Sequence, residues 1–308
     1  MGKTAFCFPG QLQERPKLED HHPLRENIHF QEWVERAHHQ TKFDLINFSF
    51  EEEESEDRLN LKLQISTYLL SMVFFYRLQS AGWMPDFLTE HSMGIYAALA
   101  ASDAIGFEDG LFITESIGRL LEREGSLRRG AMASVIGLSL EEVQKICQQL
   151  DGYHLFIANY NGSMHYVLSG EEEGVDKAIS FALSRKAVSA TRLAFNIALH
   201  SSSLLSLREE ILNLLNNIKF RAPKFPIINH WTINPLKKEE IKDFLSQEVG
   251  RPVYWVRCVE KLIQEGVHQF VEVGYESTLT KLIRWINREA EAFSAGDHLQ
   301  FPLCHSEP

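Results

Sequence analysis

The sequence PDFLTEHSMGIYAALAA, residues 85–101, carries the clearest structural signal in the chain. The segment 86–89, which Pro85 starts, predicts a short strand, and 95–101 predicts a helix. Ser92 therefore stands at the apex of a tight turn between a strand and a helix, which is the context of a nucleophile elbow. The G-x-S-x-G pattern is incomplete, because Glu90 replaces its first glycine. Taken alone, the serine is a weak indication of catalysis.

Strands and helices alternate on both sides of this turn, which predicts an α/β protein. The strand-like runs are Thr4–Phe8, Ala131–Gly137, His154–Ala158, His165–Ser169, Ala187–Phe195, Ile227–Asn229 and Gln269–Val273. The helix-like segments are Leu61–Gln79, the segment that Ser139 caps as far as about Leu150, Glu171–Ser184, Leu205–Asn217, Ile241–Glu248, Val256–Glu265 and Leu279–Glu289. A turn is predicted at 159–162 (Asn-Tyr-Asn-Gly), a charged loop at 51–57 and a loose tail over the last dozen residues.

The middle third of the chain has the order βαββαβ, which is the ferredoxin-like arrangement. We predict that residues 128–198 form a ferredoxin-like small subdomain. Residues 1–127 and 199–308 would then form an α/β-hydrolase-like large domain with a parallel sheet. The chain of 308 residues is long enough for both.

The formal net charge of −11 argues against a nucleic-acid partner, because such partners need a basic face. An acidic carrier protein would have to dock on a local basic patch. The densest group of arginines is Arg119, Arg123, Arg128 and Arg129, which could equally be a solvated helix face.

The four cysteines lie far apart, which favours neither a zinc site nor a disulfide framework and is typical of a reducing cytoplasm. The histidine pairs at 21–22 and 38–39 lack regularly spaced partners, so we expect no metal. The sequence has no signal-peptide pattern and no apolar run of about 18 residues. We expect a cytoplasmic monomer that binds no membrane and no cofactor.

Beyond the elbow, short motifs follow one another along the chain. They are Phe8-Pro9-Gly10-Gln11, Glu90-His91-Ser92-Met93-Gly94-Ile95, GAMASVIGL at 130–138, Asn159-Tyr160-Asn161, Val167–Gly170, Ala198-Leu199-His200-Ser201, Pro252–Trp255, and Glu272-Val273-Gly274 with Leu279. In this order they resemble the malonyl-CoA:acyl-carrier-protein acyltransferase family, including the freestanding acyltransferases and acyl hydrolases of polyketide biosynthesis. The resemblance covers nearly the whole chain.

The resemblance implies a mechanism. Ser92 would be the nucleophile and His200 its base, because a serine hydroxyl is a weak nucleophile until its proton is removed. The two would face each other where the domains meet. The backbone N–H groups of Gln11 and Met93 would stabilise the oxyanion. The backbone carbonyl of Glu248, where the family has glutamine, would orient His200.

The chain departs from the malonyl-specific pattern at Ile117. There the family carries an arginine that pairs with the substrate carboxylate. Arg119 is about 200° further around a helix and should point elsewhere, although an alignment shifted by two residues would give it the role. Beside Ile117 a buried carboxylate would lack a partner, so we predict an uncharged acyl substrate. His91, Glu90 and Asn161 are further candidate specificity residues.

Two other substitutions flank the nucleophile, Glu90 for glycine and Ile95 for glutamate. Glu90 lies two residues before Ser92, so both side chains would share one face of a strand. Glu90 would then either polarise a water or pair with a nearby base as a structural residue.

Three functions fit these residues. The first is an editing hydrolase that removes acyl chains from the phosphopantetheine arm of an acyl carrier protein. The second is an acyltransferase that moves an acyl group from coenzyme A, or from one carrier protein, to another. The third is a non-catalytic carrier-binding module, against which the retention of Ser92, His200 and the Gln11 turn argues.

Overall fold

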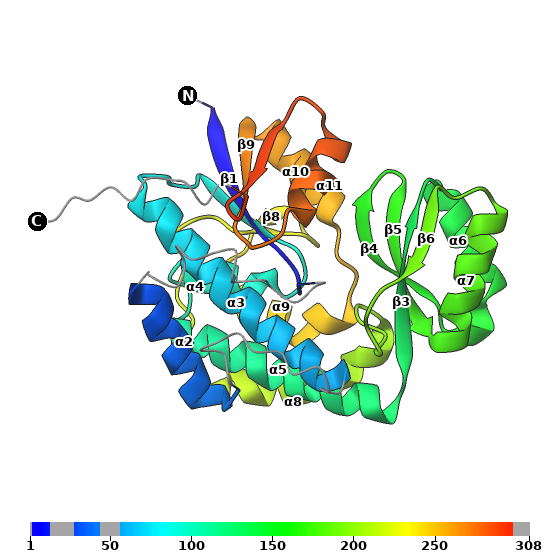
Figure 1. The fold of residues 1–308 in the computed structure, drawn as a ribbon, viewed down its shortest axis with the longest axis horizontal. Helices are drawn as coiled ribbons and strands as arrows, with labels where there is room; N and C mark the ends of the chain where they lie inside the picture. The colour runs from blue at the N-terminus through cyan, green and yellow to red at the C-terminus, as the bar shows by residue number, and fades with distance from the viewer. Residues whose placement is uncertain (1, 13–27, 44–55, 298–308) are drawn as a thin grey trace, which may run out of the picture. The chain divides into compact units, whose positions relative to one another are not determined.

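The computed structural model describes residues 2–12, 28–43 and 56–297 (Figure 1). The chain divides into two compact units. The first unit comprises residues 1–115, 219–228 and 262–308, and the second comprises 116–218 and 229–261. The small subdomain predicted at 128–198 is narrower than the second unit, because it includes only the part of the chain around the antiparallel sheet. Its boundaries stay a prediction.

The first unit is built on a four-stranded parallel sheet. Its strands are β1 (Lys3–Phe8), β2 (Phe87–Glu90), β9 (Val267–Glu272) and β10 (Glu291–Ser294), in the order β10-β9-β1-β2. The central strand β1 is completely buried from Ala5 to Phe8, as expected of a parallel strand covered on both faces. This sheet confirms the predicted α/β class. β10 was not predicted, because the helix predicted before it extended to residue 289.

Helices of the first unit flank this sheet. They are α2 (Ile28–Thr41), α3 (Glu56–Ser80), α4 (Gly94–Ala101) and α11 (Thr278–Ile286). α3 packs on β1 through Phe75, whose ring centroid lies 6.2 Å from those of both Phe6 and Phe8. The sequence analysis missed α2. The predicted loop at 51–57 and the predicted tail lie almost entirely outside the described residues, and α3 already begins at Glu56.

Two helices cross from one unit to the other, α5 (Phe107–Leu127) and α10 (Trp255–Gln264). The short elements between residue 201 and α10 are η3 (Ser202–Leu207), α8 (Arg208–Leu214), η4 (Leu215–Asn217), β7 (Ile228–Asn229), β8 (Asn234–Pro235), α9 (Lys238–Gln247) and η5 (Glu248–Gly250). None of the described helices combines the length and the hydropathy needed to cross a membrane.

The second unit contains an antiparallel sheet. Its strands are β3 (Gly130–Ile136), β4 (Phe156–Gly162), β5 (His165–Glu171) and β6 (Ser189–Arg192), in the order β4-β5-β3-β6. With α6 (Leu140–Gln149), η2 (Asp151–Tyr153) and α7 (Glu172–Ser184), the chain order is βαββαβ. Figure 1 shows α6 and α7 on one side of the sheet, where they close a core of buried residues such as Val143, Leu168 and Val175. Strand order and direction are those of a ferredoxin-like arrangement.

Ser139 caps α6 as predicted. Its Oγ accepts a hydrogen bond from the Glu142 N–H, and the Glu142 carboxylate accepts one from the Ser139 N–H at 2.8 Å. This reciprocal pair is a capping box, which satisfies two backbone donors that the helix itself leaves without acceptors. A purely local sequence signal was therefore sufficient here.

The turn predicted at 159–162 is wrong. β4 runs on through Gly162, and the chain reverses at residues 163–164. The Asn-Gly signal is overridden because Val253 pairs with β4 from the other side. The Tyr160 N–H donates to the Val253 carbonyl, and the Val253 N–H donates to the Ala158 carbonyl, both at 2.8 Å. These long-range hydrogen bonds hold the segment extended.

Candidate active site

Ser92 occupies a strained turn in the first unit. β2 ends at Glu90 and α4 begins at Gly94, so the predicted strand, turn and helix are all present. Ser92 has φ of 57°, in the left-handed region that residues with a Cβ seldom adopt. Such strain costs about 1–3 kcal/mol and persists only where the surroundings enforce it. The serine side chain is half-buried at this turn.

Gly94 enforces the turn through a close backbone approach. A Cβ at this position would lie 2.3 Å from the Phe8 carbonyl oxygen and 2.8 Å from the Pro9 carbonyl oxygen. Every residue of α4 is buried, so the helix cannot shift away from the end of β1. The second glycine of the elbow is therefore required by the proximity of β1.

The two predicted oxyanion donors both lie in this unit. Within the described part of the chain, no residue accepts a hydrogen bond from the Met93 N–H, which precedes the first turn of α4. Gln11 follows the Pro9-Gly10 turn at the end of β1. A Cβ on Gly10 would lie 3.2 Å from the His91 carbonyl oxygen and 3.8 Å from Ser92 Cβ. The Gly10 turn thus lies directly against the elbow.

The side chains of His91 and Glu90 have different surroundings. His91 Nδ1 lies 3.3 Å from where a Gly10 Cβ would be, so this side chain lines the turn between Gly10 and Gln11. Glu90 is only 1% exposed and stands opposite Phe8 in the sheet. Burial raises the pKa of the Glu90 carboxyl well above its ordinary value, which favours the neutral acid.

The expectation that Glu90 and Ser92 share a strand face is not met. The period of two holds only within a strand, and β2 ends at Glu90 itself. Ser92 then turns away through its left-handed φ. Glu90 consequently belongs to the buried side of the sheet that carries Phe8.

His200 is held in the second unit by backbone carbonyls. The residue is 3% exposed and has φ of 57°. Its Nδ1 lies 3.1 Å from the Glu248 carbonyl oxygen, the atom that the sequence analysis named. Carbonyl oxygens only accept hydrogen bonds, so Nδ1 must carry a proton. In the neutral ring, Nε2 is then the basic nitrogen.

A second carbonyl near His200 was missed. Nδ1 also lies 3.1 Å from the Arg251 carbonyl oxygen, and the His200 N–H donates to the Val249 carbonyl at 2.7 Å. All three carbonyls come from the short turn around η5. The Arg251 guanidinium stacks 4.0 Å from the Trp231 ring centroid, which holds that end of the turn. No sequence pattern indicates such a contact, because backbone carbonyls look alike at every residue.

Ile117 and Arg119 point in opposite directions. Ile117 is 2% exposed, whereas the Arg119 side chain is exposed to solvent. This agrees with the helical geometry of α5, in which residues two apart face different sides. If the substrate carboxylate were recognised at the buried position, Arg119 could not supply the charge.

Asn161 lies in β4 and is 6% exposed. Tyr160 pairs with Tyr166 and Gly162 pairs with His165, so Asn161 is the additional residue of a β-bulge. Bulges redirect side chains and are common beside active sites. The Asn-Tyr-Asn motif therefore marks an irregular strand and not a loop.

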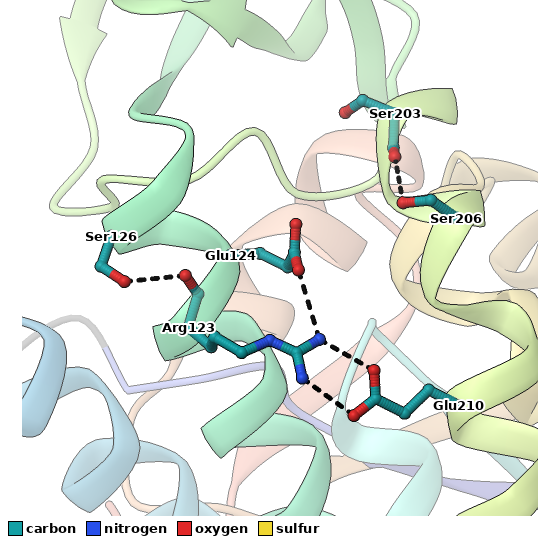
Figure 2. A network of polar contacts seen from close by, with 6 residues as sticks. All are labelled: Arg123, Glu124, Ser126, Ser203, Ser206 and Glu210. Atoms are coloured by element: carbon teal, nitrogen blue, oxygen red, sulfur yellow. Dashed lines mark hydrogen bonds and ion pairs between the residues drawn. The ribbon is translucent and has the colours of Figure 1, made fainter.

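The four arginines of α5 and its C-terminal end do not form one patch. Figure 2 shows Arg123 bound through two nitrogens to the Glu210 carboxylate, at 2.8 and 2.9 Å, and also to Glu124. Arg128 and Arg129 line a cavity of about 520 Å³ and form no ion pair with any described residue. The same cavity is lined by four glutamates, so its charge is mixed.

Glu272 is a buried carboxyl at the end of β9. Its Oε2 accepts a hydrogen bond from the Thr280 N–H at 2.7 Å, in the first turn of α11. Burial raises the pKa of Glu272 to about 7, although the backbone hydrogen bonds lower it. Two residues on, a Cβ at Gly274 would lie 2.5 Å from Pro9. The EVG motif therefore supports the Pro9-Gly10 turn.

Among the described residues, no group of three or more His, Cys, Asp and Glu side chains could hold a metal ion. His38 Nδ1 lies 2.6 Å from the Phe43 carbonyl oxygen, so one member of that histidine pair has a structural contact. The pair at 21–22 lies outside the described residues.

A parallel α/β sheet with a serine at a left-handed elbow, and a histidine whose Nδ1 faces carbonyls, are features expected of a serine enzyme of the acyl-transfer class. The model of the acyl transferase domain family matches residues 35–296. The chain therefore belongs to the acyl transferase domain family, as the sequence motifs predicted.

Named relatives match over nearly the whole chain. The malonyl CoA-acyl carrier protein transacylase of Staphylococcus aureus (strain MRSA252) is 30% identical over 297 residues, covering 96% of each protein. That of Bacillus subtilis (strain 168) is 26% identical over 304 residues, covering 96% of this chain and 94% of the relative.

Solved structures show the same fold. The malonyl CoA-acyl carrier protein transacylase of Coxiella burnetii matches with a TM-score of 0.86 and 25% identity, covering 96% of this chain and 94% of that one. A malonyl-transacylase in complex with a type II PKS acyl-carrier protein matches with a TM-score of 0.85 and 26% identity, covering 95% of each chain.

Proposed function

We propose that this enzyme transfers an uncharged acyl group between thioesters through an ester on Ser92. The donor is coenzyme A or an acyl carrier protein, and the acceptor is an acyl carrier protein. The strained Ser92 elbow is the observation that carries the proposal. The relatives are transacylases, and one was solved with its carrier protein, so transfer is favoured over the hydrolysis that we expected first.

The chemistry needs two half-reactions. His200 Nε2 takes the proton of Ser92 Oγ, and Oγ attacks the thioester carbonyl carbon. The C–S bond breaks, the acyl group becomes an ester of Ser92, and the leaving sulfur takes the proton from the imidazolium. The thiol of the acceptor then gives its proton to Nε2, and its sulfur attacks the ester carbonyl carbon. The ester C–O bond breaks, the acyl group becomes a thioester of the acceptor, and Ser92 Oγ takes the proton back from the imidazolium.

Two N–H donors and two carbonyls lower the barrier in both half-reactions. The N–H donors of Met93 and Gln11 stabilise the negative oxygen that forms at each attack. The carbonyls of Glu248 and Arg251 keep the Nδ1 proton of His200 in place and stabilise the imidazolium. No carboxylate partner is needed for the histidine.

Buried Ile117 supports the uncharged substrate. A malonyl carboxylate beside this side chain would lose its hydration without gaining an ion pair, which costs several kcal/mol. An acetyl or longer neutral acyl chain has no charge to desolvate, so we expect it to acylate Ser92 faster than malonyl does.

The test compares acetyl and malonyl thioesters of coenzyme A, with and without an empty acceptor carrier protein. Transfer predicts acyl-carrier product and little free acid when the acceptor is present. Free acid in equal amount under both conditions would instead establish the editing hydrolase. Absence of any acyl adduct on Ser92 by intact mass would establish a non-catalytic carrier-binding module.

Ile117→Arg tests the specificity. The new guanidinium should raise the ratio of kcat/KM for malonyl over acetyl by about tenfold or more, since the pairing occurs in a desolvated environment. The matched variant Arg119→Ala should leave the ratio unchanged. If the wild type already prefers malonyl and Arg119→Ala removes that preference, Arg119 is the carboxylate ligand and the uncharged substrate is wrong.

A further inference from the structure

The turn that carries Gln11 is attached to α3 by side-chain hydrogen bonds. The Gln11 amide donates from Nε2 to Asn60 Oδ1 at 2.7 Å and accepts at Oε1 from Gln64 Nε2 at 3.0 Å. The next backbone group, the Leu12 N–H, donates to Thr67 Oγ1 at 3.0 Å. Two consecutive residues after β1 are thus held by three side chains of one helix.

The three helical residues form a single stripe. Asn60, Gln64 and Thr67 are spaced four and three apart, so they lie on the same face of α3. Thr67 is 3% exposed, and its hydroxyl donates to the Leu63 carbonyl at 2.7 Å. That bond leaves the lone pairs of Oγ1 directed at the Leu12 N–H. The threonine is therefore a fixed acceptor and not a freely rotating hydroxyl.

The two oxyanion donors are supported very differently. Met93 precedes α4, whose residues are all buried and whose start presses against Phe8. Gln11 lies in irregular backbone after β1 ends at Phe8, where no strand ladder fixes the peptide. An oxyanion donor must lie about 2.7–3.1 Å from the developing charge to be effective. An irregular segment can keep that precision only through contacts such as those with α3.

We infer that Asn60, Gln64 and Thr67 are positioning residues that hold the Gln11 N–H for oxyanion stabilisation. The inference rests on the proposed function, in which that N–H is one of two donors. None of the three touches the reacting atoms, so each acts through the Gln11–Leu12 backbone. Thr67 matters most, because it fixes the backbone directly, whereas the two amides hold the Gln11 side chain.

Thr67→Val is the decisive variant, because it keeps the shape of the side chain and removes the acceptor. Thr67→Ser keeps the acceptor and should rescue. Ser71→Ala, one turn along α3, is the matched control. Ser71 is 1% exposed, and its hydroxyl has no hydrogen-bond partner among the described residues. It therefore removes a buried hydroxyl from the same helix without touching the Gln11 turn.

We expect Thr67→Val to lower kcat for acetyl transfer by about 10- to 100-fold with little change in KM, since the lost interaction acts in the transition state. Thr67→Ser and Ser71→Ala should stay within about threefold of wild type. The Asn60→Ala/Gln64→Ala double variant should show the same pattern with a smaller loss. A Thr67→Val enzyme with wild-type kcat, or one whose activity falls only with its folded fraction, would overturn the inference.

Amide hydrogen exchange separates this inference from the proposed function. The Leu12 N–H should exchange at least about tenfold faster in Thr67→Val than in Ser71→Ala, whatever the substrate. If the wild type forms no acyl-Ser92, the proposed function fails. The exchange rates of the Leu12 N–H then still test whether Thr67 holds the turn. Equal exchange in the two variants would show that Thr67 does not hold the turn.

Discussion

The elbow of Ser92 and the turn around His200 reach the same backbone conformation by different means. Both residues have φ of 57°, which is unusual for side chains with a Cβ. Ser92 is held in it by close packing, since Gly94 two residues on lies against the Phe8 carbonyl at the end of β1. His200 is held by carbonyls 48 to 51 residues away. Strain at a functional residue can thus be maintained by close backbone packing or by hydrogen bonds to backbone carbonyls.

This difference has a consequence for mutation. The elbow depends on side chains, or on the lack of one at Gly94, so single substitutions can destroy it. The support of His200 depends on backbone carbonyls, which side-chain substitutions leave in place. We therefore expect the elbow to be sensitive and the η5 turn to be tolerant, apart from the histidine itself.

The largest effect should come from the two reacting side chains. Ser92→Ala should abolish the acyl adduct, and His200→Ala should lower its rate of formation by about 10³-fold or more, because such pairs act as a unit. Intact mass after mixing with acetyl thioester measures both. Circular dichroism should show wild-type folding in each variant. Undiminished turnover in either one would refute the mechanism.

Gly94→Ala should break the elbow. Its Cβ would meet the Phe8 carbonyl oxygen at 2.3 Å, and we expect a loss of about 3 kcal/mol or more in the free energy of unfolding. Gly152→Ala is the matched control, because a Cβ there has no atom within 4 Å. It should change stability by no more than about 0.5 kcal/mol. Denaturant titration of both variants checks this, and equal losses would show that the close approach at Gly94 is not limiting.

Glu272 should make stability depend on pH. Its pKa is raised by burial from 4.5 to about 7, so the folded state holds a proton that the unfolded chain releases earlier. The stabilisation is complete below about pH 4.5 and is lost as pH rises to about 7, a change of about 3 kcal/mol.

Glu272→Gln should remove that dependence while keeping an oxygen for the Thr280 N–H. The measurement is the difference in unfolding free energy between variant and wild type across this range. His230 also titrates, because burial lowers its pKa to about 3, but it is common to both proteins and cancels in the difference. A difference that does not vary with pH would mean that Glu272 is ionised in the folded protein.

The smallest effect should follow Glu248→Gln. Only the carbonyl of this residue contacts His200 at hydrogen-bond distance, and its Oε1 lies 3.9 Å from Nδ1. We expect kcat to change by less than about twofold, as for the exposed control Glu260→Gln. A loss above about tenfold in Glu248→Gln alone would show that the carboxylate helps to orient the histidine.

Local sequence determined much of the fold. The strands at 4–8, 86–89 and 269–273 and the cap at Ser139 were predicted, because each has a sequence signal within a few positions. The turn at Ser92 was predicted from the strand before it and the helix after it, although its close approach to Phe8 is a long-range contact. Buried parallel strands leave an almost continuous apolar run, which periodicity detects easily. The motifs that follow one another along nearly the whole chain also led to the correct family.

Distant contacts decided the rest. The strand through 159–162 follows pairing with Val253, and the second carbonyl at His200 belongs to Arg251. The hydrogen bonds of Gln11 to Asn60 and of Leu12 to Thr67 likewise join segments about 50 residues apart. The sequence alone thus determined which residue types are available for chemistry. Only the tertiary structure decided which backbone groups hold them, because every peptide carries the same donor and acceptor and folding alone selects which of them meet.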